Sequence, residues 1–260
     1  MNPRVLTIAL LVFTIVLSGL LTSLGCSAPN TNTITRAKAA IIDQLHTRHP
    51  NQAFIEQTTQ YLEDYGFEVD VCRGDAVTVD LYRKLPTFGY KLIIFRVHSG
   101  LLGVDPKVTN RTWLFTAEPY SEMRHVTEQL TEQLTYARVN EDEPWIFAVS
   151  AKFITRSMEG QFNKTAIIMM GCDCLHFRDL AQAFIQKGAS TYIAWDFSVG
   201  VNYVDDATTA LIEKLCLKEL TLGTAVAKTM NEKGPDPKHG SVLKYYPLQT
   251  GAKTLRQLIK

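Results

Sequence analysis

The chain has 260 residues, of which 46% are hydrophobic and 20% are charged, and its formal net charge is +1. This composition is typical of a globular protein with one large domain or two small ones. The balanced charge gives no support for a surface that binds a polyanion, and we do not expect nucleic acid as a partner.

The first predicted element is an apolar segment that follows Arg4. Residues 5–25, VLTIALLVFTIVLSGLLTSLG, contain no charged residue, which indicates a secretory signal, a lipoprotein signal or an uncleaved membrane anchor. The stretch Ser-Leu-Gly-Cys that ends at Cys26 resembles a lipobox, in which the cysteine is lipidated after cleavage. We therefore expect an exported, membrane-anchored protein, with the signal or anchor in residues 1–26 and a polar linker in residues 27–36.

Strand and helix patterns alternate from residue 37 onward, and unbroken apolar strands are typical of a parallel sheet covered on both faces. The patterns predict a single α/β domain over residues 37–260, a three-layer sandwich with a mostly parallel central sheet flanked by helices. Strands are predicted at 38–45, 67–74, 91–100, 164–171, 190–196 and 241–249, and helices at 51–66, 78–90, 177–188, 205–220 and 221–234. Pro86 is expected to break the second of these helices.

The middle of the chain, residues 101–163, is less regular. Residues 111–120 predict a strand or one arm of a hairpin, and residues 144–154 an edge strand. Between them, residues 121–139 have the pattern of a polar amphipathic helix that Ser121 would cap.

Two predicted strands end in residues that can carry chemistry. IIFRVHSG ends near His98, and AIIMMGC ends at Cys172. Catalysts and ligands in parallel sheets usually lie at the carboxyl ends of strands. A histidine can activate a cysteine nucleophile, and backbone amides of Cys172 and of the Ser99–Gly100 turn can stabilise an oxyanion. The alternative is that Cys172 is a buried core thiol and His98 an ordinary loop residue.

The spacing of the cysteines indicates neither a metal site nor a required set of disulfides. Cys172, Cys174 and His176 occupy alternate positions, but no second ligand pair follows them, so a metal site is disfavoured. Cys72, Cys174 and Cys216 are available for disulfides outside the cytoplasm, although a domain of this length does not require them. No glycine-rich phosphate loop follows the first strand, and no cofactor is expected.

Three blocks of sequence resemble the caspase–hemoglobinase-fold cysteine peptidases, which include caspases, legumain, gingipain, clostripain, separase and the CHAT domains. The blocks are IIFRVHSG, AIIMMGCD and LAQAFIQKGASTYIAWD, and the order of elements is similar from residue 37 to residue 248. MMGCD looks most like separase and the CHAT proteins. The caspase string Gln-Ala-Cys-Arg-Gly is absent, and Met170 stands where clostripain-like enzymes have an acidic residue.

This resemblance implies a cysteine endopeptidase with a peptide or protein substrate. His98 matches the general acid/base of the family and Cys172 its nucleophile, with the amides of Gly100 and Cys172 as the oxyanion hole. Asp173, Trp195 and Asp196 are candidates for a substrate pocket. Two alternatives remain: a catalytically inactive relative that binds or senses, and an α/β ligand-binding lipoprotein.

Overall fold

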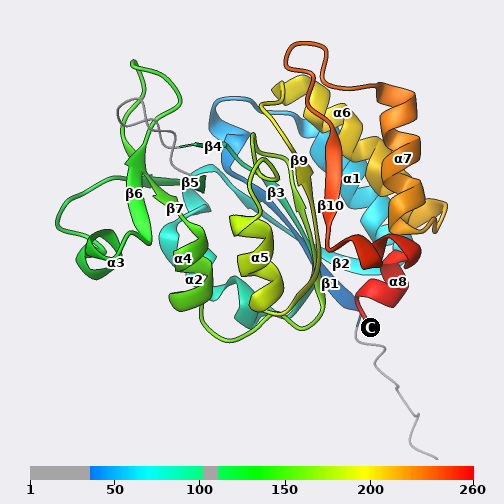
Figure 1. Ribbon diagram of the computed structural model, residues 1–260, viewed down its shortest axis with the longest axis horizontal. Coiled ribbons are helices and arrows are strands. Elements are labelled where there is room, and N and C mark those ends of the chain that lie inside the picture. Colours follow the sequence, from blue (N-terminus) through cyan, green and yellow to red (C-terminus); the bar gives the residue numbers. More distant parts are fainter. Residues whose placement is uncertain (1–35, 102–110) are drawn as a thin grey trace, which may run out of the picture. The chain divides into compact units, whose positions relative to one another are not determined.

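A six-stranded sheet forms the centre of the computed structural model, which describes residues 36–101 and 111–260 (Figure 1). Its strand order is β10-β9-β8-β3-β1-β2, and all neighbours are parallel except β10, which runs antiparallel to β9. The strands are β1 (Ala37–Asp43), β2 (Phe67–Arg73), β3 (Tyr90–Arg96), β8 (Thr165–Met169), β9 (Ala189–Trp195) and β10 (Leu243–Tyr246). The prediction of an α/β fold with a mostly parallel sheet is confirmed.

Helices cover both faces of this sheet. Along β3, Ile93 and Phe95 belong to one hydrophobic cluster, while Leu92 and Ile94 belong to the other. The first cluster includes side chains from α2 (Val79–Lys84), α4 (Ala151–Arg156) and α5 (Asp179–Gln186). The second includes side chains from α1 (Gln52–Tyr65), α6 (Val201–Ile212), α7 (Leu222–Lys233) and α8 (Leu255–Leu258). The unbroken apolar strands of the sequence thus correspond to strands that are buried on both sides.

Local sequence signals explain where several helices begin and end. The Asn51 side chain accepts a hydrogen bond from the Phe54 amide at the start of α1, and Gly66, at φ 109°, ends that helix in the left-handed region. Pro86 ends α2, as predicted, and lies in a 3-10 helix, Leu85–Phe88. Shorter helical turns occur at Gln44–Thr47, Gly74–Ala76 and Leu248–Ala252, and α6 continues into a π-helical turn, Glu213–Leu217.

A second, antiparallel sheet has the order β4-β5-β7-β6. Its strands are β4 (Ser99–Leu101), β5 (Thr112–Pro119), β6 (Leu134–Ala137) and β7 (Ile146–Val149). The strand predicted at 111–120 is therefore confirmed. The strand predicted at 144–154 is shorter than expected, and it lies between β5 and β6 rather than at an edge.

The helix predicted over residues 121–139 is wrong. Only α3 (Val126–Leu130) is helical, and the chain then forms β6, whose residues pair with β7. The Ser121 hydroxyl accepts a hydrogen bond from the Met123 amide and does not cap α3, since the residue before that helix is His125, at φ 53°. Pairing with β7 satisfies the β6 backbone and outweighs the helical pattern of a polar segment.

Residues 36–260 form one compact unit, and every member of both hydrophobic clusters lies within it. These residues thus contain a complete core of their own. None of the helices in the described ranges is long and apolar enough to cross a membrane. The predicted signal or anchor, Cys26 and the linker fall outside the described residues.

Candidate functional site

His98 lies two residues after the end of β3, at the carboxyl edge of the central sheet. Its backbone amide donates a hydrogen bond of 2.9 Å to the Gln44 side chain. Its ring packs edge-on against His49, with 5.9 Å between centroids, and at 6.3 Å from the ring of Phe115. His49 lies just before α1, so the imidazole of His98 is next to the helical layer that includes α1.

Cys172 follows β8, the neighbour of β3 in the sheet. The Val199 amide donates a hydrogen bond to its Sγ at 3.4 Å, and the thiol lies 3.7 Å from the Val199 carbonyl oxygen. The side chain is half-buried and packs against the same hydrophobic cluster as α1 and α6. Two adjacent parallel strands therefore deliver His98 and Cys172 to one edge of the sheet.

The contact that joins these two strand ends is made by Ser99. Its hydroxyl donates a hydrogen bond of 2.6 Å to the carbonyl oxygen of Cys172 and lies 3.1 Å from the Cys174 thiol. Gly171 is needed for this approach, since a methyl group there would overlap the Ser99 hydroxyl. The residue after His98 thus touches the backbone of Cys172. No hydrogen bond between described residues joins the His98 ring to the Cys172 thiol.

The His98 imidazole and the Cys172 thiol are both uncharged at neutral pH. Burial, together with the nearby His49 and Arg96, lowers the pKa of His98 to about 4. Burial raises the pKa of the Cys172 thiol, and the carboxylates of Asp173 and Asp236 raise it further, whereas the hydrogen bond with Val199 lowers it. At neutral pH the site therefore holds a neutral imidazole and a protonated thiol rather than an ion pair, and the lowered pKa makes this imidazole a weaker base than an ordinary histidine.

Backbone amides also gather at this edge. Phe115 donates to the His98 carbonyl oxygen at 3.0 Å, and hydrogen-bonded pairs alternate with non-bonded pairs in an antiparallel ladder. By that alternation the amide of Gly100 faces its partner Trp113 in β5, whereas the amide of Ser99 faces the free edge of β4. The amides of Ser99 and Cys172 have no acceptor among the described residues. Ser99 and Gly100 lie in strand β4 rather than in a turn, and of the two Ser99 is the better placed oxyanion donor.

Asp173 is the predicted pocket residue nearest to the thiol in the chain. Its backbone is left-handed, at φ 56°, which turns the chain sharply after the cysteine. The Ser198 hydroxyl donates to its Oδ2 at 3.4 Å, and burial raises the pKa of this half-buried carboxyl.

The other two predicted pocket residues are engaged in the fold. Asp196 forms an ion pair of 2.7 Å with Lys244 and accepts the Val242 amide at 2.8 Å, so its charge fastens β10 to the end of β9. Trp195 is only 1% exposed and packs edge-on against Tyr203, with 5.5 Å between ring centroids. In this conformation neither offers a free group to a substrate.

The remaining cysteines of the described ranges form neither a disulfide nor a metal site. All four cysteines in the described ranges are free thiols, and no group of three or more metal-ligating side chains occurs there. Cys174 is fully buried beside Ser99, and burial raises its pKa strongly. His176 is exposed and packs against Phe177 and Phe197.

Arg96 is a supporting residue that the sequence patterns did not single out. Its guanidinium is completely buried and binds Asp43 at 2.7 Å and both carboxylate oxygens of Asp205 at 2.8 Å. It also donates to the His49 carbonyl oxygen at 2.8 Å, which fixes the segment beside His98. The available signal was the charged residue that follows the apolar run Leu92–Phe95, because a charged residue buried with such a run needs a partner.

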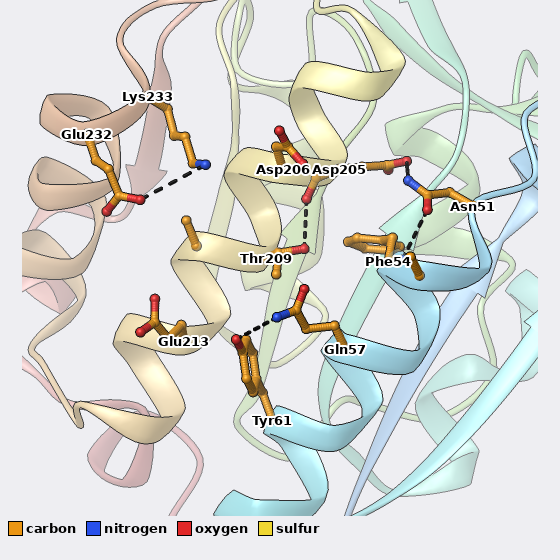
Figure 2. A pocket seen from close by; sticks show the side chains of 12 residues that line it. Asn51, Phe54, Gln57, Tyr61, Asp205, Asp206, Thr209, Glu213, Glu232 and Lys233 are labelled. Atoms are coloured by element: carbon orange, nitrogen blue, oxygen red, sulfur yellow. Dashed lines mark hydrogen bonds and ion pairs between the residues drawn. The ribbon is translucent and has the colours of Figure 1, made fainter.

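Two other pockets in the described residues are not lined by a cysteine. Figure 2 shows a polar pocket of about 290 Å³ between α1, α6 and α7, in which Asn51 is turned toward Asp205. Two of its acidic side chains form ion pairs outside it, Glu232 with Lys214 and Glu213 with Lys218. A second pocket, of about 650 Å³, lies along β10. The edge with His98 and Cys172 remains the best candidate for chemistry.

In comparisons with known proteins, no family model matches the chain and no curated protein matches it.

Proposed function

We propose that this protein is an exported, membrane-tethered cysteine endopeptidase with a caspase-like domain, in which Cys172 is the nucleophile and His98 the general acid/base. The observation that carries the proposal is the hydrogen bond from Ser99 to the Cys172 carbonyl oxygen. It brings the residue next to His98 against the backbone of the nucleophile at the carboxyl edge of the sheet. The apolar segment at residues 5–25 supports export and tethering.

The proposed reaction begins with the resting protonation states. The neutral imidazole of His98 takes the proton of the Cys172 thiol as the sulfur attacks a peptide carbonyl carbon. The amides of Cys172 and Ser99 receive the oxyanion. The imidazolium then protonates the leaving amine, which gives a thioester, and water activated by His98 hydrolyses it. Because the thiol has a raised pKa, the reaction depends on this base.

Substrate selection in this proposal involves Asp173. Its half-buried carboxylate stands one residue from the nucleophile and would favour a basic side chain. Trp195 and Asp196 would act indirectly, by holding the end of β9 and the start of β10 in place.

A second candidate function is a catalytically inactive binding or sensing domain. It is favoured by the raised pKa of Cys172 together with the thiol's hydrogen-bond contacts, which go to Val199 rather than to His98.

Peptidyl acyloxymethyl ketones that differ in the side chain next to the ketone distinguish the two functions. We expect them to label Cys172 in residues 36–260, as mapped by mass spectrometry, and labelling to fall sharply in His98→Ala. Cys174→Ser is the matched control and should be labelled like the parent. No label at Cys172 across the panel, or equal labelling of His98→Ala, would contradict the peptidase and support the inactive domain.

A further inference from the structure

Exposed apolar side chains are concentrated in one short stretch of the chain. Ten large hydrophobic side chains are exposed in the described residues, and six of them lie between residues 123 and 145. Isolated exposed apolar residues are normal, whereas a contiguous patch marks an interaction site. The six are Met123 (86% exposed), Leu130 (81%), Val126 and Tyr136 (44% each), and Val139 and Trp145 (43% each). We call this set the α3–β6 face.

The first half of this face is carried by α3. Val126 and Leu130 are one helical turn apart, so their side chains lie on one stripe of α3, and the exposed Met123 lies in the turn before the helix. No residue of α3 is buried. An amphipathic turn whose apolar side chains face water gains nothing from hydrophobic burial in the domain alone. The stripe is therefore available to a partner.

A row of aromatic rings runs from Tyr120, which follows β5, over Tyr136 of β6 to Trp145, which precedes β7. The Tyr120 hydroxyl donates to Gln129 of α3 at 2.9 Å, and its ring lies 5.3 Å from that of Tyr136. Tyr136 in turn packs edge-on against Trp145, with 5.0 Å between centroids. Strand β6 is the outer strand of the four-stranded sheet, and it lies near α3 in Figure 1. The hydrogen bond of Tyr120 thus connects α3 to the aromatic row.

The charges around the face are predominantly negative. Glu122, Glu141 and Asp142 are exposed, and none forms an ion pair within the described parts of the chain. The nearby Arg124 is paired with Glu118 at 2.8 Å. Arg138 stacks over Trp145 at 4.3 Å and donates to a backbone carbonyl. A partner with lysine or arginine at its margin would complement this rim.

We propose that the α3–β6 face binds an amphipathic helix of a partner protein, apolar on one side and flanked by basic residues. A helix satisfies its own backbone hydrogen bonds, so side-chain contacts with an aliphatic stripe and an aromatic row suffice to hold it. A second copy of this chain would bring two acidic rims together, and an anionic lipid surface would repel the same rim. Both are therefore poorer occupants.

A labelled model helix tests this proposal on residues 36–260. The probe is a 14-residue leucine–lysine amphipathic peptide, followed by fluorescence anisotropy, with a leucine–glutamate peptide of the same pattern as its counterpart. We expect binding of the lysine peptide only, and a loss of at least about tenfold in affinity for Leu130→Lys, as for a central interface residue. Leu248→Lys, at a residue that is 74% exposed outside the face, is the matched control and should bind normally.

The acidic rim is tested separately. Glu141→Gln with Asp142→Asn should weaken binding and reduce its dependence on salt concentration. Equal binding of the two peptides, no binding of either, or an equal loss in Leu248→Lys would overturn the proposal. Sedimentation and flotation with phosphatidylglycerol vesicles test the other occupants. Self-association or vesicle binding that Leu130→Lys abolishes would assign the face to a second copy or to lipid instead.

Discussion

Replacing Arg96 with methionine should destabilise the domain far more than removing a surface ion pair. The guanidinium is fully buried between Asp43 and Asp205, whose side chains are 0% and 2% exposed. Methionine fills a similar volume but leaves two buried carboxylates without a cation. Removing one partner of a buried ion pair typically costs about 3–5 kcal/mol, and here two carboxylates lose the same partner.

Urea unfolding of residues 36–260 measures this loss. With an m-value of about 2 kcal/mol/M, the midpoint should fall by about 2 M. Arg256→Met is the matched control, because Arg256 pairs with Glu219 at 2.9 Å where both side chains are more than half exposed. It should lose less than about 1 kcal/mol.

Charge, rather than volume, is the expected cause of the Arg96 effect. Converting Asp43 and Asp205 to asparagine in the Arg96→Met background should therefore recover a large part of the lost stability. The prediction would be wrong if the urea midpoint of Arg96→Met were close to that of Arg256→Met. It would also be wrong if the triple variant were no more stable than Arg96→Met alone.

Three further outcomes are expected at the carboxyl edge of the sheet. Gly171→Ala should lower the free energy of unfolding by about 1–3 kcal/mol in urea, because its methyl would overlap the Ser99 hydroxyl and lie 2.9 Å from the Val97 carbonyl oxygen; unchanged stability would contradict that packing. Ser99→Ala should leave the Cys172 carbonyl oxygen without its hydrogen bond and lower the free energy of unfolding by about 1–3 kcal/mol. It should also alter the rate at which iodoacetamide alkylates Cys172, and an unaltered rate would show that Ser99 does not influence the thiol. Since the folded pKa of His98, about 4, lies below its ordinary value of 6.5, its contribution to stability is complete above pH 6.5 and is lost as the pH falls toward 4. That loss amounts to about 3 kcal/mol, and His98→Gln should flatten the urea midpoint over this pH range, whereas a parallel decline in both proteins would exclude His98 as its source.

Much of the central fold could be predicted because its strands and helices have strong local patterns. The continuous apolar run of β3 and the paired signals Asn51 and Gly66 of α1 need no tertiary information to be recognised. The helix prediction for residues 121–139 was wrong because the helical pattern there is weak. A polar segment with scattered leucines fits a helix, but pairing with β7 decides the structure of β6, and that pairing is not visible locally.

The candidate site was predictable only in its main residues. Strand ends pointed to His98 and Cys172, but their supports depend on contacts between distant parts of the chain. Ser99 meets the Cys172 carbonyl across 73 positions, and Arg96 meets Asp205 across 109. The register of β4 against β5, which directs the Ser99 amide to the free edge, likewise has no local signal.

Cleavage of a defined peptide library tests the proposed endopeptidase most directly. Residues 36–260 would be incubated with a proteome-derived peptide library, and new amino termini would be quantified by mass spectrometry. We expect internal cleavage by the parent and by Cys174→Ser, and none by Cys172→Ala or His98→Ala. Absence of cleavage by the parent, or the same cleavage by Cys172→Ala, would contradict the proposed function.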